Sequence, residues 1–146
     1  MRIRADGELA AAPADVWRVL TDWEGQASWM PDVAWIRVLG AERELGARLE
    51  VRTRVFGIPG ATDRVTVTVW EPPQRITISH DGVVRGVGEW RLAPVGNGEA
   101  TRLDWSERLC MSPAVLGEIA LQLYGPWQRW MVRRSIRNLS RIVAAG

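Results

Sequence analysis

Glu107 is the residue whose type and position most favour proton chemistry in this sequence. Apolar and polar residues alternate over 101–110, and this period of two places Glu107 on the same side as Leu103 and Trp105. A carboxyl group on an apolar side is costly to charge, so it either has a partner or takes part in a reaction. The alternative is a glutamate at a cavity mouth, solvated or paired with Arg85 or Arg108.

His80 and Tyr124 are two further candidates for catalysis. His80, the only histidine, shares one side of a predicted strand with Ile76 and Ile78, and it could act as a general base or orient a ligand carbonyl. It also lies at a strand end before a turn signal, where exposure to solvent is common. Tyr124 could donate a hydrogen bond to a ligand, or its phenol could reach solvent beside the Gly-Pro pair that follows it.

A second set of residues has the chemistry to bind an apolar or flat aromatic molecule. Trp90 and Trp105 lie on the expected apolar sides of neighbouring strands, and Trp127 faces them from the last helix. Indole rings around one space bind flat ligands by stacking and by burial of apolar area. Rings that simply fill the core are an equally good interpretation. The expected ligand-binding set is completed by Leu103, Leu92, Val67 and Leu123.

The hydrophobic periodicity predicts one strand, two short helices, six strands and a long helix, in that order. Pro13 and Asp15 suit the first turn of a helix over 11–23. Thr21 to Glu24 has capping-box spacing for a second helix that stops before Pro31. Short turns between strands favour an antiparallel meander. Strands are expected at 2–10, 33–39, 48–56, 64–70, 75–80, 84–94 and 101–110.

The last helix is expected to run from an N-cap at Ser112-Pro113 to about Ala144. Gly125-Pro126 interrupts it and predicts a kink or break, so that one helix bends around a curved sheet. Beyond the proline the apolar stripe moves to a new face. Its residues there are Val132, Ile136, Leu139 and Val143.

Four arginines recur every fourth residue along this helix. The simplest interpretation is a solvated helix face. The alternative is a basic strip that contacts an anionic membrane surface or an acidic partner. The residues are Arg129, Arg133, Arg137 and Arg141.

The totals fit a single domain over residues 1–146. All nineteen basic residues are arginine and the net charge is +2, so no nucleic-acid partner is expected. The N-terminal segment lacks the apolar core of a signal peptide, which favours a cytoplasmic protein, as a monomer or homodimer. One histidine and one cysteine argue against a transition-metal site, and no cofactor is expected. Cys110 is interpreted as a buried, inert thiol.

Three segments resemble the START-like (SRPBCC) superfamily, and in particular its polyketide cyclase/dehydrase and lipid-transport group. They are "AAPADVWRVLTDWEGQASWMPDV", "GVGEWRLAPVGNGEATRLDW" and "YGPWQRWMVRRSIRNLSRIV". The resemblance implies an α+β helix-grip fold, with a curved antiparallel sheet of about seven strands around a long C-terminal helix. Two short helices would lie between strands 1 and 2. It also implies a cavity for an apolar or aromatic small molecule.

The superfamily resemblance leaves three functions open, because this scaffold serves several of them. The first is a carrier or binding protein for a lipid-like or polyketide-like molecule. The second is a polyketide aromatase/cyclase or dehydratase, in which Glu107, His80 or Tyr124 would move protons. The third is a protein-interaction module of the chaperone-activator type, which predicts a collapsed cavity and an exposed apolar patch.

Overall fold

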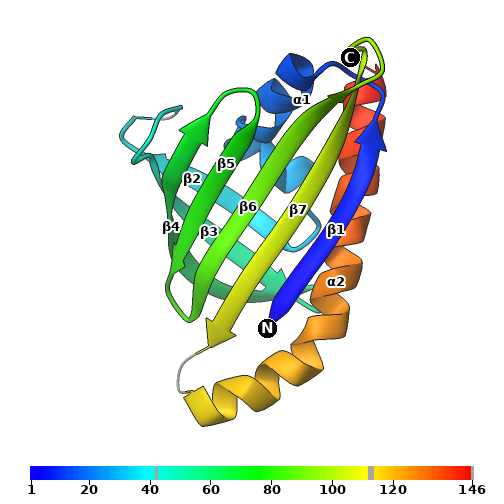
Figure 1. The fold of residues 1–146 in the computed structure, drawn as a ribbon. Helices are drawn as coiled ribbons and strands as arrows, with labels where there is room; N and C mark the ends of the chain where they lie inside the picture. Colours follow the sequence, from blue (N-terminus) through cyan, green and yellow to red (C-terminus); the bar gives the residue numbers. More distant parts are fainter. Residues whose placement is uncertain (42, 112–113, 146) are drawn as a thin grey trace.

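The computed structural model describes residues 1–41, 43–111 and 114–145. It describes their side chains as well, except those of residues 111–121. Seven strands and three helical segments follow one another along the chain (Figure 1). Their order and type are those expected from the periodicity. They are β1 (Arg2–Leu9), α1 (Pro13–Leu20), η1 (Glu24–Ser28), β2 (Val33–Leu39), β3 (Arg48–Val55), β4 (Ile58–Glu71), β5 (Arg75–Asp81), β6 (Val84–Val95), β7 (Ala100–Met111) and α2 (Ala114–Ala145).

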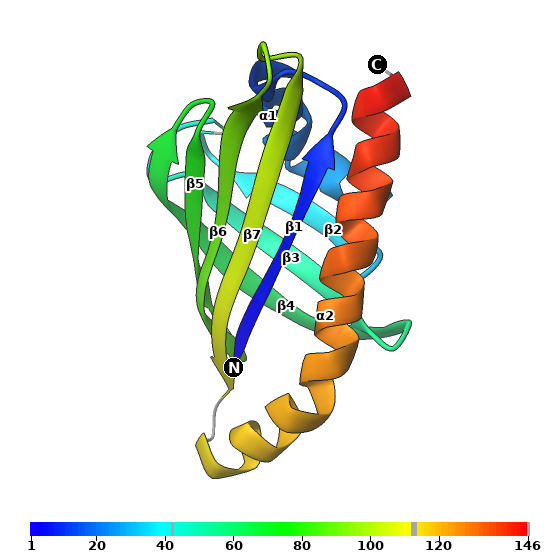
Figure 2. The ribbon, with the colours of Figure 1, turned by 45° about the vertical axis from the view of Figure 1, so that its right-hand side comes forward.

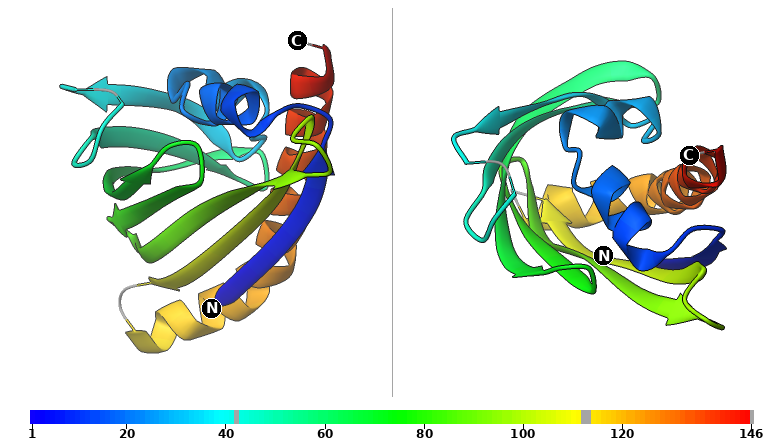
Figure 3. Two further views of the ribbon diagram at one scale, coloured as in Figure 1. Left: turned by 45° about the horizontal axis from the view of Figure 1, so that its top comes forward. Right: turned by 90° about the horizontal axis from the view of Figure 1, so that it is seen from above.

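All seven strands form one antiparallel sheet in the order β1-β7-β6-β5-β4-β3-β2. The sheet curves strongly, and α1 and η1 lie within the opening of the curve when the molecule is seen from above (Figure 3). Irregularities in register in β2, β3 and β4 fit this curvature, because a bulge bends its strand and increases its twist. The predicted α+β helix-grip fold is confirmed.

The strand β4 is longer than its sequence pattern indicates. The alternation of valines predicts only 64–70, whereas β4 begins at Ile58. Phe56 and Gly57 both have positive φ, of 51° and 79°, which makes the tight hairpin turn between β3 and β4. The residues 58–63 therefore continue the ladder with β3 although their own pattern is not strand-like.

Thr21 corrects the predicted start of the second helix. Its hydroxyl donates to the carbonyl of Trp17 at 2.8 Å, so it ends α1 instead of capping the next helix. Thr21 still has helical backbone angles, φ −90° and ψ 0°, and its backbone N–H also donates to the carbonyl of Trp17, at 2.9 Å. The second helix is a 3₁₀ segment whose N-cap residue, Trp23, forms no side-chain cap.

The helix α2 continues through Pro126 as one element and bends in its lower part (Figure 2). The bend confirms the predicted kink, and it lets the second half of α2 pack on β1 and β7. That half buries the predicted stripe, and Asn138 donates to the carbonyl of Trp29 at 3.1 Å. The predicted N-cap at 112–113 lies outside the described residues. The buried stripe is Val132, Ile136, Leu139 and Val143.

Candidate functional site

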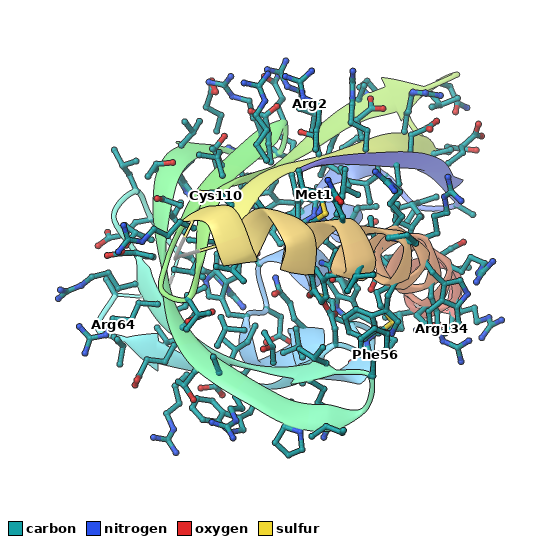
Figure 4. The ribbon with its side chains drawn as sticks, turned by 90° about the horizontal axis from the view of Figure 1, so that it is seen from below. Met1, Arg2, Phe56, Arg64, Cys110 and Arg134 are labelled. Carbon is teal, nitrogen blue, oxygen red and sulfur yellow. The ribbon has the colours of Figure 1, made fainter. Side chains whose placement is uncertain are left out.

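A cavity of about 460 Å³ lies between the concave face of the sheet and α2. Its wall is mostly apolar, and the size lies in the range of roughly 300–1,000 Å³ that small-molecule sites occupy. The exposed side chains of Phe56, Val83 and Leu123 belong to its lining and mark the mouth. Seen from below, the first half of α2 crosses this open end of the sheet, and Phe56 lies beside the helix (Figure 4).

Six of the sequence-predicted site residues line this cavity. Trp90 and Trp105 lie on neighbouring strands with ring centroids 5.4 Å apart. Their use in ligand binding or catalysis stays a prediction. The six are Trp90, Trp105, Leu123, Glu107, His80 and Tyr124.

Four other expected ligand-binding residues are not among the lining residues. Leu92 and Leu103 are buried in the part of β6 and β7 that α1 covers. Val67 is 1% exposed and is packed in the core. Trp127 packs on the rings of Phe56 and Tyr124, with centroids 5.0 and 5.2 Å away, so it supports the mouth from outside.

Glu107 lies inside the cavity, not at its mouth. It is 8% exposed, and its Oε1 accepts a hydrogen bond from the indole Nε1 of Trp105 at 3.1 Å. Burial raises the pKa of Glu107, and hydrogen bonds from Trp105 and from Gln128 partly oppose this shift. An arginine partner is not found within the described chain, and Arg108 is exposed on the opposite face of β7. Glu107 therefore has neutral partners in an apolar wall.

Asp32 and Gln128 complete this polar group, and sequence reasoning missed both. Burial and the nearby Glu107 raise the pKa of Asp32 to about 6. Hydrogen bonds from its own backbone N–H and from Gln128 lower this pKa and oppose part of the shift. Gln128 is 6% exposed and interacts with both carboxyl groups. Its Oε1 accepts a hydrogen bond from the hydroxyl of Tyr124 at 2.7 Å. We call Asp32, Glu107, Gln128 and Tyr124 the polar cluster.

Tyr124 is held in the cluster by helix geometry. It stands four residues before Gln128 on α2, so the two side chains share one face of the helix. Burial raises the pKa of Tyr124, and Asp32 and Glu107 add to this because a phenolate would be repelled by their charges. Tyr124 is thus a hydrogen-bond donor in the cluster at neutral pH. The sequence signal for Gln128 was its spacing of four residues from Tyr124. For Asp32 the sequence shows only that it follows Pro31, which does not indicate a site.

His80 lines another part of the cavity wall. Burial lowers its pKa, and the nearby Asp63 opposes this, so the imidazole is neutral at neutral pH. Its Nε2 is buried and has no hydrogen-bond partner within the described chain. The residues beside it in the next strand are Gly86 and Gly88, and a Cβ at Gly86 would collide with the carbonyl of Arg108. The interpretation of His80 as solvent-exposed is not supported, since it is only partly exposed.

Other predictions concern the surface. The arginines 129, 133, 137 and 141 are exposed along α2, and contact with an anionic membrane or an acidic partner stays a prediction. Cys110 is exposed, which corrects its interpretation as a buried thiol, because it lies on the outer side of β7. The described residues contain no cluster of three metal-ligating side chains. No helix in the described part of the chain is long and apolar enough to cross a membrane.

The curved sheet, the long C-terminal helix and the cavity between them define a helix-grip domain. The chain belongs to the polyketide cyclase / dehydrase and lipid transport family, whose model matches residues 1–144. No significant match was found among curated proteins.

Solved structures share this fold at low sequence identity. A protein of Thermus thermophilus, TTHA0849, is 21% identical with a TM-score of 0.81, and the match covers 99% of this chain and 98% of that one. A START superfamily protein from Mycobacterium smegmatis is 16% identical, with a TM-score of 0.79 and coverage of 99% and 97%. The Zhui aromatase/cyclase from Streptomyces sp. R1128 is 20% identical, with a TM-score of 0.75 and coverage of 99% and 92%.

Proposed function

We propose that this protein binds a hydrophobic or aromatic small molecule, lipid-like or polyketide-like, as a carrier or binding protein. The observation that supports this is the apolar cavity of about 460 Å³ with the indoles of Trp90 and Trp105 in its wall. Flat apolar ligands gain most from such a wall, because stacking adds to the burial of apolar area. The alternative of an interaction module expects a collapsed cavity, and the open cavity does not support it.

Intrinsic tryptophan fluorescence tests this proposal. The protein is titrated with fatty acids, isoprenoids, flavonoids and polycyclic aromatics, and Trp90→Phe and Trp105→Phe are titrated in parallel. Saturable quenching that weakens in both variants supports a ligand in the cavity. Trp35→Phe is the matched control, because Trp35 is not among the lining residues and packs under Arg37 at 4.7 Å. A flat response to the whole panel in folded protein contradicts the proposal.

A polyketide cyclase or dehydratase is the second candidate, and the polar cluster favours it. Two carboxyl groups with raised pKa values lie within an apolar cavity, where one can accept a proton and the other donate one. In a dehydrative cyclisation one group would remove a proton from carbon and the other would protonate the departing hydroxyl. The cavity would contribute by restricting the conformers of a flexible substrate.

Turnover separates the two candidates. A poly-β-carbonyl thioester is incubated with the protein, and cyclised or dehydrated product is followed by absorbance and by loss of water in mass spectra. An enzyme should lose rate in Glu107→Gln and Asp32→Asn while still binding the product. A carrier should bind the compounds without turnover, and Glu107→Gln should hardly change that binding if the ligand is uncharged.

A further inference from the structure

The charged side chains that line the cavity are all acidic. Asp32 comes from the loop before β2, Asp63 from β4 and Glu107 from β7. No arginine is among the lining residues with described side chains. The segment 111–121, whose side chains are not described, contains no arginine or lysine. All nineteen arginines of this chain are therefore kept away from the cavity wall.

None of these three carboxyl groups forms an ion pair within the described chain. Their partners are an indole N–H, a side-chain amide and a backbone N–H, all of them neutral. Carboxylates taken out of water cost free energy unless a cation compensates them. Asp32 and Glu107 form a pair, because the amide of Gln128 interacts with both and the charge of Glu107 acts on Asp32. The described wall therefore holds carboxyl groups with no positive charge of the protein beside them.

We infer that the ligand supplies this charge, with a cationic nitrogen between Asp32 and Glu107 and a flat apolar body against Trp90 and Trp105. This inference rests on the proposed small-molecule binding. The indole faces suit the flat apolar body of such a ligand, because stacking adds to the burial of apolar area. Trp90 also brings a polar group without a partner to this wall, since its indole N–H is buried and no acceptor lies within the described chain.

Protons compete with a cationic ligand for this site. Burial raises the pKa of both carboxyl groups, that of Asp32 to about 6, so each takes up a proton at a higher pH than a free carboxyl group does. His80 on β5 and Asp63 on β4 also face the cavity, and Tyr124 faces it from α2 without charge. Protonation of Asp32, Glu107 or His80 weakens the attraction for a cation. Affinity for a cation should therefore fall from pH 8 to pH 5, and affinity for a neutral analogue should not.

Three naphthalene probes that differ only in their polar end test the inference. They are 2-naphthylmethylamine, 2-naphthylmethanol and 2-naphthoate, measured by isothermal titration calorimetry at pH 8. The ammonium should bind at least tenfold more tightly than the alcohol, and the carboxylate should bind most weakly. Asp32→Asn and Glu107→Gln should each reduce the preference for the ammonium about tenfold and change the affinity for the alcohol less than twofold.

Asp104→Asn is the matched control, because Asp104 lies on β7 like Glu107 but on the outer face, near Arg102. This variant should keep the full preference for the ammonium over the alcohol. The inference is overturned if the alcohol or the carboxylate binds as tightly as the ammonium, or if both cavity variants keep the preference. In either case a bound naphthalene leaves the proposed function standing. If none of the three probes binds, the inference fails, and the fluorescence panel decides whether the proposed function fails with it.

Discussion

The two halves of the concave face differ although the same strands build them. Near α1, Leu92 and Leu103 face each other on β6 and β7 and are buried beneath the helix. Toward the other end of the same pair of strands, Gly88 faces Glu107. We call these the packed half and the cavity half. The change from two leucines to a glycine and an acid separates a hydrophobic core from an open cavity.

Tryptophan rings also pack beneath α1. Trp17 of α1 packs edge to face on Trp70 of β4 with ring centroids 5.0 Å apart. Trp23 lies 6.4 Å from the same ring and also borders the cavity. Large rings fill the space beneath α1. The cavity half has its own ring pair, Trp90 and Trp105, but leaves an open space beside it that polar groups line. The comparison teaches that close packing and an open, partly polar cavity are found at different ends of one sheet.

Leu103→Ala should have the largest effect on stability. Leu103 is 0% exposed in the packed half, so its truncation leaves a cavity and costs about 2–5 kcal/mol in the free energy of unfolding. Leu109→Ala is the matched control, because Leu109 lies on the same face of β7 but borders the existing cavity. It should cost at least about 1 kcal/mol less. Urea unfolding measures both, and equal losses would remove the distinction between the halves.

Asp32→Asn should remove one pH-dependent contribution to the free energy of unfolding. The folded pKa of Asp32, about 6, lies above the unfolded value of about 4, so the folded state binds the extra proton between these values. The stability that this group contributes is present below pH 4 and is lost as the pH rises through 6. The Asn variant should therefore gain roughly 2 kcal/mol relative to wild type between pH 4 and pH 7.

The comparison of unfolding curves at pH 4, 5, 6 and 7 tests this expectation. The difference between the two proteins is the quantity to follow, because other carboxyl groups titrate in both. Asp104→Asn controls for the loss of a carboxyl group on the outer face of the sheet. A difference that stays constant with pH for Asp32→Asn would mean that its surroundings do not shift the pKa of Asp32.

The sequence predicts the fold well because its elements depend on local patterns. Alternating valines, the proline at the start of α1 and the rotated stripe of α2 each favour one structure within a few residues. Thr21 was misplaced because the same residue type can end one helix or begin another. The strand at 58–63 was missed because pairing with β3 imposes it, which no local pattern encodes.

The site is predicted only in part, for the same reason. Period two correctly places Glu107, Trp90 and Trp105 on the concave side. It cannot tell which part of that side is filled, so Leu92 and Leu103 were expected at the ligand although α1 covers them. The pairing of carboxyl groups comes from separate elements, since Asp32 precedes β2 whereas Glu107 lies on β7. Only the curvature of the whole sheet brings them together.

Ala61→Phe should affect binding more than stability. Ala61 lines the cavity on β4 and is partly exposed, so a larger side chain can occupy cavity space without disturbing the packed half. Affinity for a ligand found in the fluorescence titration should fall at least tenfold, about 1.4 kcal/mol. The free energy of unfolding should change by less than about 1 kcal/mol. Thr62→Phe, on the exposed outer face beside it, should leave affinity unchanged, and equal losses in both variants would contradict the prediction.

Phe56→Ala should have the smallest effect on stability and act on exchange rates. Phe56 is 62% exposed and touches Trp127 across the mouth, so its ring contributes less than about 1 kcal/mol. Alanine adopts the same positive φ at a similar cost, which leaves the turn intact. Without the ring the mouth is wider, so association and dissociation of ligand should both accelerate in stopped-flow fluorescence while Kd stays within twofold. Ile58→Ala, exposed in the same hairpin but outside the lining, should leave both rates unchanged. If Phe56→Ala also leaves both rates unchanged, the ligand enters elsewhere, and the cavity half does not extend to the β3–β4 turn.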